Sequence, residues 1–144
     1  MIKLPPIAKI YEAYTCIADE RIKMKENEAI VSSSDGKKSY KIKWKNNDYT
    51  SNDNATFWQG YPGYPVIAIL MLQNKLSYNE EIVNLFTNIN WHELNDKYKR
   101  YYDKAVEEVL RNIDYDSEII KKETEKIYEE IKNLDIQIKR KLEE

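Results

Sequence analysis

Four aromatic residues fall within eight positions of this 144-residue chain, and they are its strongest candidates for binding chemistry: Phe57, Trp58, Tyr61 and Tyr64. Gly60 and Gly63 lie among them and allow the backbone to bend sharply. Tyrosine and tryptophan combine a large apolar surface with one polar atom, so they often anchor binding surfaces. With Asn54 just before it, this aromatic turn (residues 57–64) is expected either to contact a partner or line a small pocket, or to fill the space between a sheet and helices.

A second candidate is a run of lysines that alternates with apolar residues. Alternation at period two places the lysines on one face of a strand and Tyr40, Ile42 and Trp44 on the other. Such a basic stripe could follow a phosphate backbone, although the aromatic residues would point away from it. The stripe could equally be a solvated sheet face. Its members are Lys37, Lys38, Lys41, Lys43 and Lys45.

An apolar seam near the carboxyl end is a third candidate, this time for self-association. It alternates steps of three and four residues, as in a coiled coil. An open apolar stripe must be covered, either by folding back on the preceding helix or by pairing with a second copy of the chain. The residues that would make this contact are Ile120, Ile127, Ile131, Leu134 and Ile138.

Familiar catalytic and metal-binding patterns are missing from the sequence. His92 is the single histidine and has no serine or cysteine pattern around it that would form a triad. Cys16 is the single cysteine, which excludes an internal disulfide and a cysteine-rich zinc cluster. No glycine-rich phosphate loop occurs. We therefore expect no metal and no cofactor, and an enzyme would require a pocket with a desolvated ionisable group.

Composition adds further limits. The net charge of −2 favours neither nucleic acid nor a membrane surface as a bulk partner. The longest apolar run, residues 64–72, is far shorter than the roughly 20 residues of a membrane span, and the amino terminus does not resemble a signal peptide. These features predict a cytoplasmic protein without membrane association.

The elements that would position these candidates can be read from the spacing of apolar residues. A helix is expected over about 7–18, followed by three or four antiparallel strands with a type I′ hairpin at Asp35–Gly36. Pro65 suits the first turn of a helix, and the uninterrupted apolar run 66–72 predicts that this helix is buried on most sides.

The last part of the chain is expected to be helical and charged. Asn79 and Asn90 are predicted helix caps, one long helix is expected over 91–113, and another begins near Asp116 or Ser117. The sequence thus predicts one α+β domain over 1–144. Residues 1–90 would form its core, and the helices of 91–144 could form a hairpin or project from it.

Residues 21–72 resemble the ββα unit of SWIM-type zinc fingers, in which a hairpin and a following helix share a metal. In the ligand positions of that family, this chain has Ser51, Asp53, Gly63 and Pro65, and Ala68 falls at the family's helix alanine. None of the four can complete a tetrahedral zinc site. The resemblance therefore implies a metal-free binding or scaffolding module.

Together these features predict a non-catalytic interaction or scaffolding protein that self-associates as a homo-dimer or contacts another protein. A nucleic-acid-binding module that uses the lysines is the alternative. An enzyme with an unrecognised site is the third and least favoured hypothesis.

Overall fold

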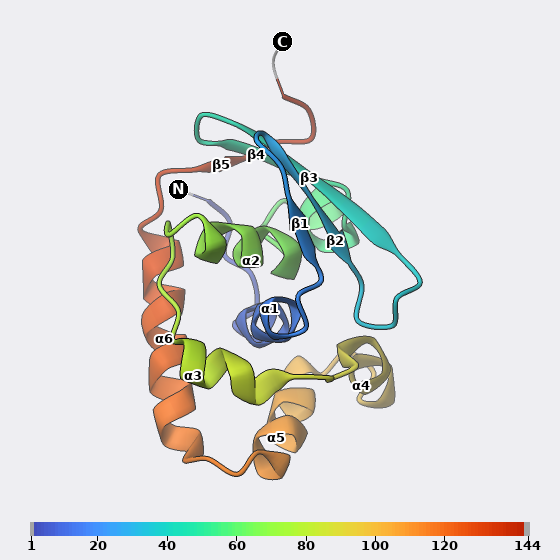
Figure 1. Cartoon of the computed structure of the whole chain (residues 1–144), viewed down its shortest axis with the longest axis vertical. Coiled ribbons are helices and arrows are strands. Elements are labelled where there is room, and N and C mark those ends of the chain that lie inside the picture. The colour runs from blue at the N-terminus through green and yellow to red at the C-terminus, as the bar shows by residue number, and fades with distance from the viewer. Residues whose placement is uncertain (1, 143–144) are drawn as a thin grey trace.

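The computed structural model describes residues 2–142. Two helices, α1 (Ala8–Ala18) and α2 (Tyr64–Leu72), pack against each other at the centre of the molecule (Figure 1). A mixed sheet covers one side of this pair, and α6 (Ser117–Lys132) runs along another. The architecture is α+β, as the sequence predicts.

Helix α2 is the buried central helix that the apolar run predicts. Residues 66–71 have no exposed surface, and Pro65 lies in the first turn, where its missing amide proton costs nothing. Gly63 precedes the helix in an extended conformation. The helix carries no polar face because the sheet and α1 cover it on both sides.

Helix α1 is buried more completely than its sequence suggests. Lys9, Glu12 and Thr15 are buried together with the apolar residues of this helix. Two hydrogen bonds explain how polar residues are accommodated there. Trp91 Nε1 donates to Thr15 Oγ1 over 2.9 Å, and the Tyr14 hydroxyl lies 2.9 Å from Thr124 Oγ1.

The sheet has five strands in the order β1-β2-β3-β4-β5. The first four are antiparallel neighbours, as predicted: β1 (Ile22–Met24), β2 (Glu28–Ser32), β3 (Ser39–Lys45) and β4 (Asp48–Ser51). The fifth, β5 (Gln137–Ile138), was not predicted and pairs parallel to β4. It returns from the carboxyl end of the chain, so that both halves of the sequence contribute to one sheet.

The connection between β2 and β3 lies where the sequence predicts a hairpin, but it is not a type I′ turn. Gly36 has a φ of +74°, whereas Asp35 is not among the residues with positive φ. Instead the Asp35 carboxylate accepts hydrogen bonds from Ser33 Oγ at 2.7 Å and from the Lys37 amide at 3.0 Å. These bonds hold a longer loop, residues 33–38, in a defined shape.

The remaining helices are short, and side chains cap α3 and α4. They are α3 (Glu80–Val83), the 3₁₀ turn η2 (Asn84–Phe86), α4 (Trp91–Lys97) and α5 (Tyr102–Asn112). The caps predicted at Asn79 and Asn90 are confirmed, and Asp116 rather than Ser117 caps α6. The single helix predicted over 91–113 is wrong, because Lys99 and Arg100 have φ values of 51° and 67° and break it in two.

The apolar seam of α6 faces the core and not the solvent. Ile120, Ile127 and Ile131 have no exposed surface, and Leu134 and Ile138 pack partly buried against the same core. The hydroxyl of Tyr128 donates to the Pro5 carbonyl at 2.9 Å. The seam is therefore covered by its own chain, which corrects its assignment as a self-association surface and the expectation of a projecting helix.

Ile127→Ala tests this placement. Removing a buried isoleucine side chain leaves a cavity and should lower the free energy of unfolding by about 2–5 kcal/mol. Because the contact is intramolecular, the loss should be the same at low and high protein concentration in denaturant titrations. A loss that varies with protein concentration would indicate that Ile127 contacts a second copy.

Candidate binding cleft

The aromatic turn is built on a buried aspartate. The Asp53 carboxylate accepts hydrogen bonds from Ser51 Oγ and from the Thr56 amide, the latter at 3.1 Å. The Gly63 amide in turn donates to Thr56 Oγ1 at 2.9 Å. This network starts the single π-helical turn η1 (Ala55–Gln59) and ties it to the beginning of α2.

Three of the positions compared with zinc-finger ligands meet in this network. A Cβ atom on Gly63 would lie 2.4 Å from Asp53 Oδ2, so only glycine fits there. Ser51 Oγ and the Thr56 amide both donate to the Asp53 carboxylate, so this carboxylate is already engaged within its own loop. Within residues 2–142, no group of three or more His, Cys, Asp or Glu side chains is arranged to hold a metal ion.

The rings of the aromatic turn divide between surface and interior. Trp58 is 65% exposed and contacts Phe57 edge to face, with 4.9 Å between the ring centres. The Arg140 guanidinium lies 5.2 Å and 5.5 Å from the centres of these two rings and donates to the Phe57 carbonyl. Tyr64 instead packs inward, with its ring centre 6.4 Å from that of Tyr40.

Two adjoining hollows lie between α1, the 33–38 loop and the aromatic turn, and we call them together the tyrosine cleft. The inner part has a volume of about 400 Å³ and is lined by Glu12, Tyr40 and Tyr64 among others. The outer part, of about 380 Å³, reaches Trp58, Gln59 and Tyr61. Both parts share Lys9, Asn54, Ala55, Arg100 and Tyr102.

A buried ion pair forms the floor of the tyrosine cleft. Lys9 and Glu12 are only 8% and 5% exposed, and Lys9 Nζ lies 3.3 Å from Glu12 Oε2. The same ammonium lies 4.5 Å from the centre of the Tyr102 ring. Despite the short distance, Glu12 Oε2 has no hydrogen bond of acceptable geometry to any described residue.

Burial dominates the electrostatics of this pair. Desolvation raises the pKa of the Glu12 carboxyl, against the opposing influence of Lys9, Asn95 and Arg21. Desolvation alone would lower the pKa of Lys9, but Glu12 and Tyr102 outweigh it and the pKa is raised. Lys9 therefore stays charged at neutral pH, while Glu12 holds its proton to a higher pH than an exposed glutamate.

The rim of the cleft carries cations that have no charged partner. Lys37, Lys38 and Arg100 line the inner part and form no ion pair with any described residue. The acids beside them are engaged: Asp35 and Asp53 accept hydrogen bonds from their own loops. The rim thus offers positive charge to a ligand more readily than negative charge.

The predicted basic stripe is divided by the fold. Lys37 and Lys38 reach the tyrosine cleft, whereas Lys41, Lys43 and Lys45 are exposed along β3. Lys41 also forms an ion pair with Glu28 at 3.7 Å. The predicted stripe is therefore shared between the rim of the cleft and the exposed face of β3.

The surroundings of His92 and Cys16, the two residues that sequence analysis considered for catalysis, do not indicate a catalytic role. His92 is exposed, and its Nε2 atom lies 3.4 Å from Asp96 Oδ2 at the edge of the inner part. Cys16 is fully buried, and burial raises the pKa of its thiol to about 12, so it is protonated and unreactive at neutral pH.

Sequence analysis missed Lys9, Glu12, Arg100 and Tyr102. A detectable sign of the first two is their spacing of three residues within a helix whose other faces are apolar, which makes an ion pair possible. Arg100 and Tyr102 carried no sign, because the break between α4 and α5 that turns them toward the cleft contains neither glycine nor proline.

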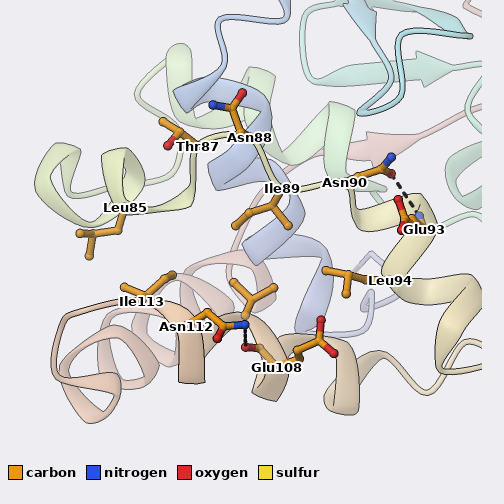
Figure 2. Close-up of a pocket in the computed structure, with 11 residues that line it drawn as sticks. Leu85, Thr87, Asn88, Ile89, Asn90, Glu93, Leu94, Glu108, Asn112 and Ile113 are labelled. Atoms are coloured by element: carbon orange, nitrogen blue, oxygen red, sulfur yellow. Dashed lines mark hydrogen bonds between the residues drawn. The ribbon is translucent and has the colours of Figure 1, made fainter.

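Another hollow of similar size, about 390 Å³, lies between η2 and α5 (Figure 2). Leu85, Ile89 and Ile113 give it apolar walls, and Glu108 on its edge is engaged by Lys97 and by Tyr98. It contains no buried charged side chain. The tyrosine cleft is therefore the better candidate for a functional site.

Fold and cleft together define an α+β protein whose first helix, α1, carries a buried ion pair beneath an aromatic and cationic cleft. The chain belongs to the family described as "Uncharacterised conserved protein UCP014422", whose model matches residues 2–137. No curated protein and no solved structure matches it. Among the described residues, no helix has both the length and the apolar character to cross a membrane.

The raised pKa of Glu12 makes a prediction about pH. The folded protein holds this proton more tightly than the unfolded chain, in which the pKa is about 4.3. The free energy of unfolding that Glu12 contributes should therefore fall as pH rises from about 4.3 through the raised value. Denaturant titrations of wild type and Glu12→Gln across this range should show a difference that declines with pH.

The matched control is Glu81→Gln, which replaces an exposed carboxyl. It should leave the pH dependence of the wild type unchanged. A wild-type curve parallel to that of Glu12→Gln across the acid range would show that Glu12 is not desolvated.

Proposed function

We propose that this chain is a non-catalytic binding protein that holds a small anionic, aromatic ligand in the tyrosine cleft. The observation that carries the proposal is the lining of the outer part. Lys9 and Arg100 supply two cations, and Trp58, Tyr61 and Tyr102 supply three aromatic rings. No acidic residue among the described ones lines this part of the cleft.

The Lys9 ammonium and the backbone of Arg100 are held in place before a ligand arrives. Lys9 Nζ is positioned by Glu12 on one side and by the Tyr102 ring on the other. The backbone of Arg100 is fixed in the left-handed region, and its amide donates to the Asn95 carbonyl at 2.7 Å. Groups that are already ordered lose little entropy on binding, which favours affinity for a small ligand.

Arg100→Gln tests the proposal with a simple probe. 1-Naphthalenesulfonate is flat and anionic, and its neutral sulfonamide has nearly the same shape. We expect the sulfonate to bind more tightly to the wild type in equilibrium dialysis. A charge-assisted hydrogen bond contributes about 1.5–3 kcal/mol, so Arg100→Gln should weaken sulfonate binding about tenfold or more.

Arg111→Gln removes an exposed cation from α5 outside the cleft and is the matched control. It should leave binding of the sulfonate unchanged. Equal affinity for sulfonate and sulfonamide, or equal losses in the two arginine variants, would reject the cleft as an anion site.

A second candidate function is contact with another protein or with a second copy of the chain through Phe57 and Trp58. The exposure of Trp58 favours it, because an aromatic side chain that is 65% exposed is a typical interface anchor. The turn is also held from both ends of the chain. Lys3 Nζ donates to the Gln59 carbonyl at 2.9 Å, and Arg140 stacks on the two rings.

Trp58→Ala tests this second function. If Trp58 anchors a homo-dimer, sedimentation equilibrium should show a dimer for the wild type and a monomer for the variant. Tyr101→Ala removes an equally exposed aromatic ring and is the control. A wild type that sediments as a monomer at every concentration would exclude the homo-dimer.

A further inference from the structure

One buried carboxylate oxygen in the inner part of the tyrosine cleft lies near a cation but accepts no hydrogen bond of good geometry from the described residues. Glu12 is 5% exposed and lines the inner part, and its Oε2 atom forms no hydrogen bond within the described chain. Buried polar atoms are nearly always satisfied, and one that is not loses the hydration it had in water. A ligand that donates a hydrogen bond to this oxygen would compensate for the lost hydration.

The charges around Glu12 limit what that donor can be. Lys9 Nζ lies 3.3 Å from the carboxylate, and the charge of Arg21 also acts on it. Arg100 lines the same part of the cleft. A ligand ammonium group would approach three cations at once, which is unfavourable in a poorly hydrated site. A neutral donor, such as an N–H or O–H group, therefore suits this oxygen better than a cation does.

The walls of the inner part favour a flat ring. Tyr40, Tyr64 and Tyr102 line it, and the first two rings are nearly perpendicular, with 84° between their planes. Aromatic side chains arranged in this way pack against a flat heterocycle by stacking and by edge-to-face contact. The volume of about 400 Å³ is large enough for such a ring and leaves the outer part for an attached group.

We propose that the ligand is a guanine nucleotide, whose base donates neutral N–H groups to Glu12 while its phosphate lies near Lys9 and Arg100. This inference rests on the proposed anion-binding function and deepens it. Proteins that bind single bases combine stacking with hydrogen bonds to the base edge in this way. Guanine offers a ring N–H beside an amino group, whereas the adenine ring nitrogen at the same edge is an acceptor.

Isothermal titration calorimetry with GMP and with AMP, in the absence of added metal, tests the inference. We expect the wild type to bind GMP at least tenfold more tightly than AMP. Glu12→Gln should remove that preference, while Glu81→Gln, an exposed carboxyl, should keep it. Circular dichroism establishes that each variant is folded. If Glu12→Gln does not fold, the wild type labelled at glutamate carboxyl carbons decides, because GMP should shift a buried resonance and AMP should not.

Each outcome separates this inference from the function on which it rests. Equal affinities for GMP and AMP, both weakened by Arg100→Gln, would overturn the guanine assignment and leave the anion site standing. A preference for GMP that persists in folded Glu12→Gln would also overturn it. If neither nucleotide nor 1-naphthalenesulfonate binds, the anion site and the guanine assignment fail together.

Discussion

The structure depends on the burial of α1 from Ala8 to Cys16, a stretch that carries a lysine and a glutamate into the core. Removing two charges from water costs several kcal/mol each, and attraction between them recovers this only with good geometry. Here Lys9 is compensated by Glu12 and the Tyr102 ring, but one Glu12 oxygen is left without a hydrogen bond. A pair of apolar residues would fill the same space at lower cost. That the chain keeps a charged pair at this position is why we place its function there.

Much of the fold could be predicted because local patterns and tertiary burial agree. The run 66–72 is apolar on every face, and residues 66–71 of it are fully buried. The alternation of apolar and lysine side chains around Ile42 predicts β3 correctly, because successive side chains of a strand with one buried face point to opposite sides of the sheet. Asn79 and Asn90 cap helices in the structure because each side chain accepts from a backbone amide three residues on.

What sequence reasoning missed has a common physical origin in contacts between distant residues. β5 is only two residues long, and its pairing with β4 depends on α6 delivering the chain to that edge. The turn at Lys99 and Arg100 uses left-handed conformations that neither residue favours, so tertiary packing decides it. In the same way, the sequence alone suggests that Lys9 and Glu12 lie on a solvated face of their helix. Only the packing of the surrounding elements shows that they are buried. The aromatic turn could be identified from its composition. The cleft that it borders could not, because the other walls come from distant parts of the chain.

The stacking of Arg140 on Phe57 and Trp58 joins residues that are 83 positions apart. Long-range contacts of this kind close late in folding, because a large loop must be ordered before they form. Because residues 57–64 precede Arg140 in the sequence, the ribosome releases the aromatic turn well before the arginine that stacks on it. Until then the two rings lack the cation that packs on them, and this surface is complete only after the final strand has joined the sheet.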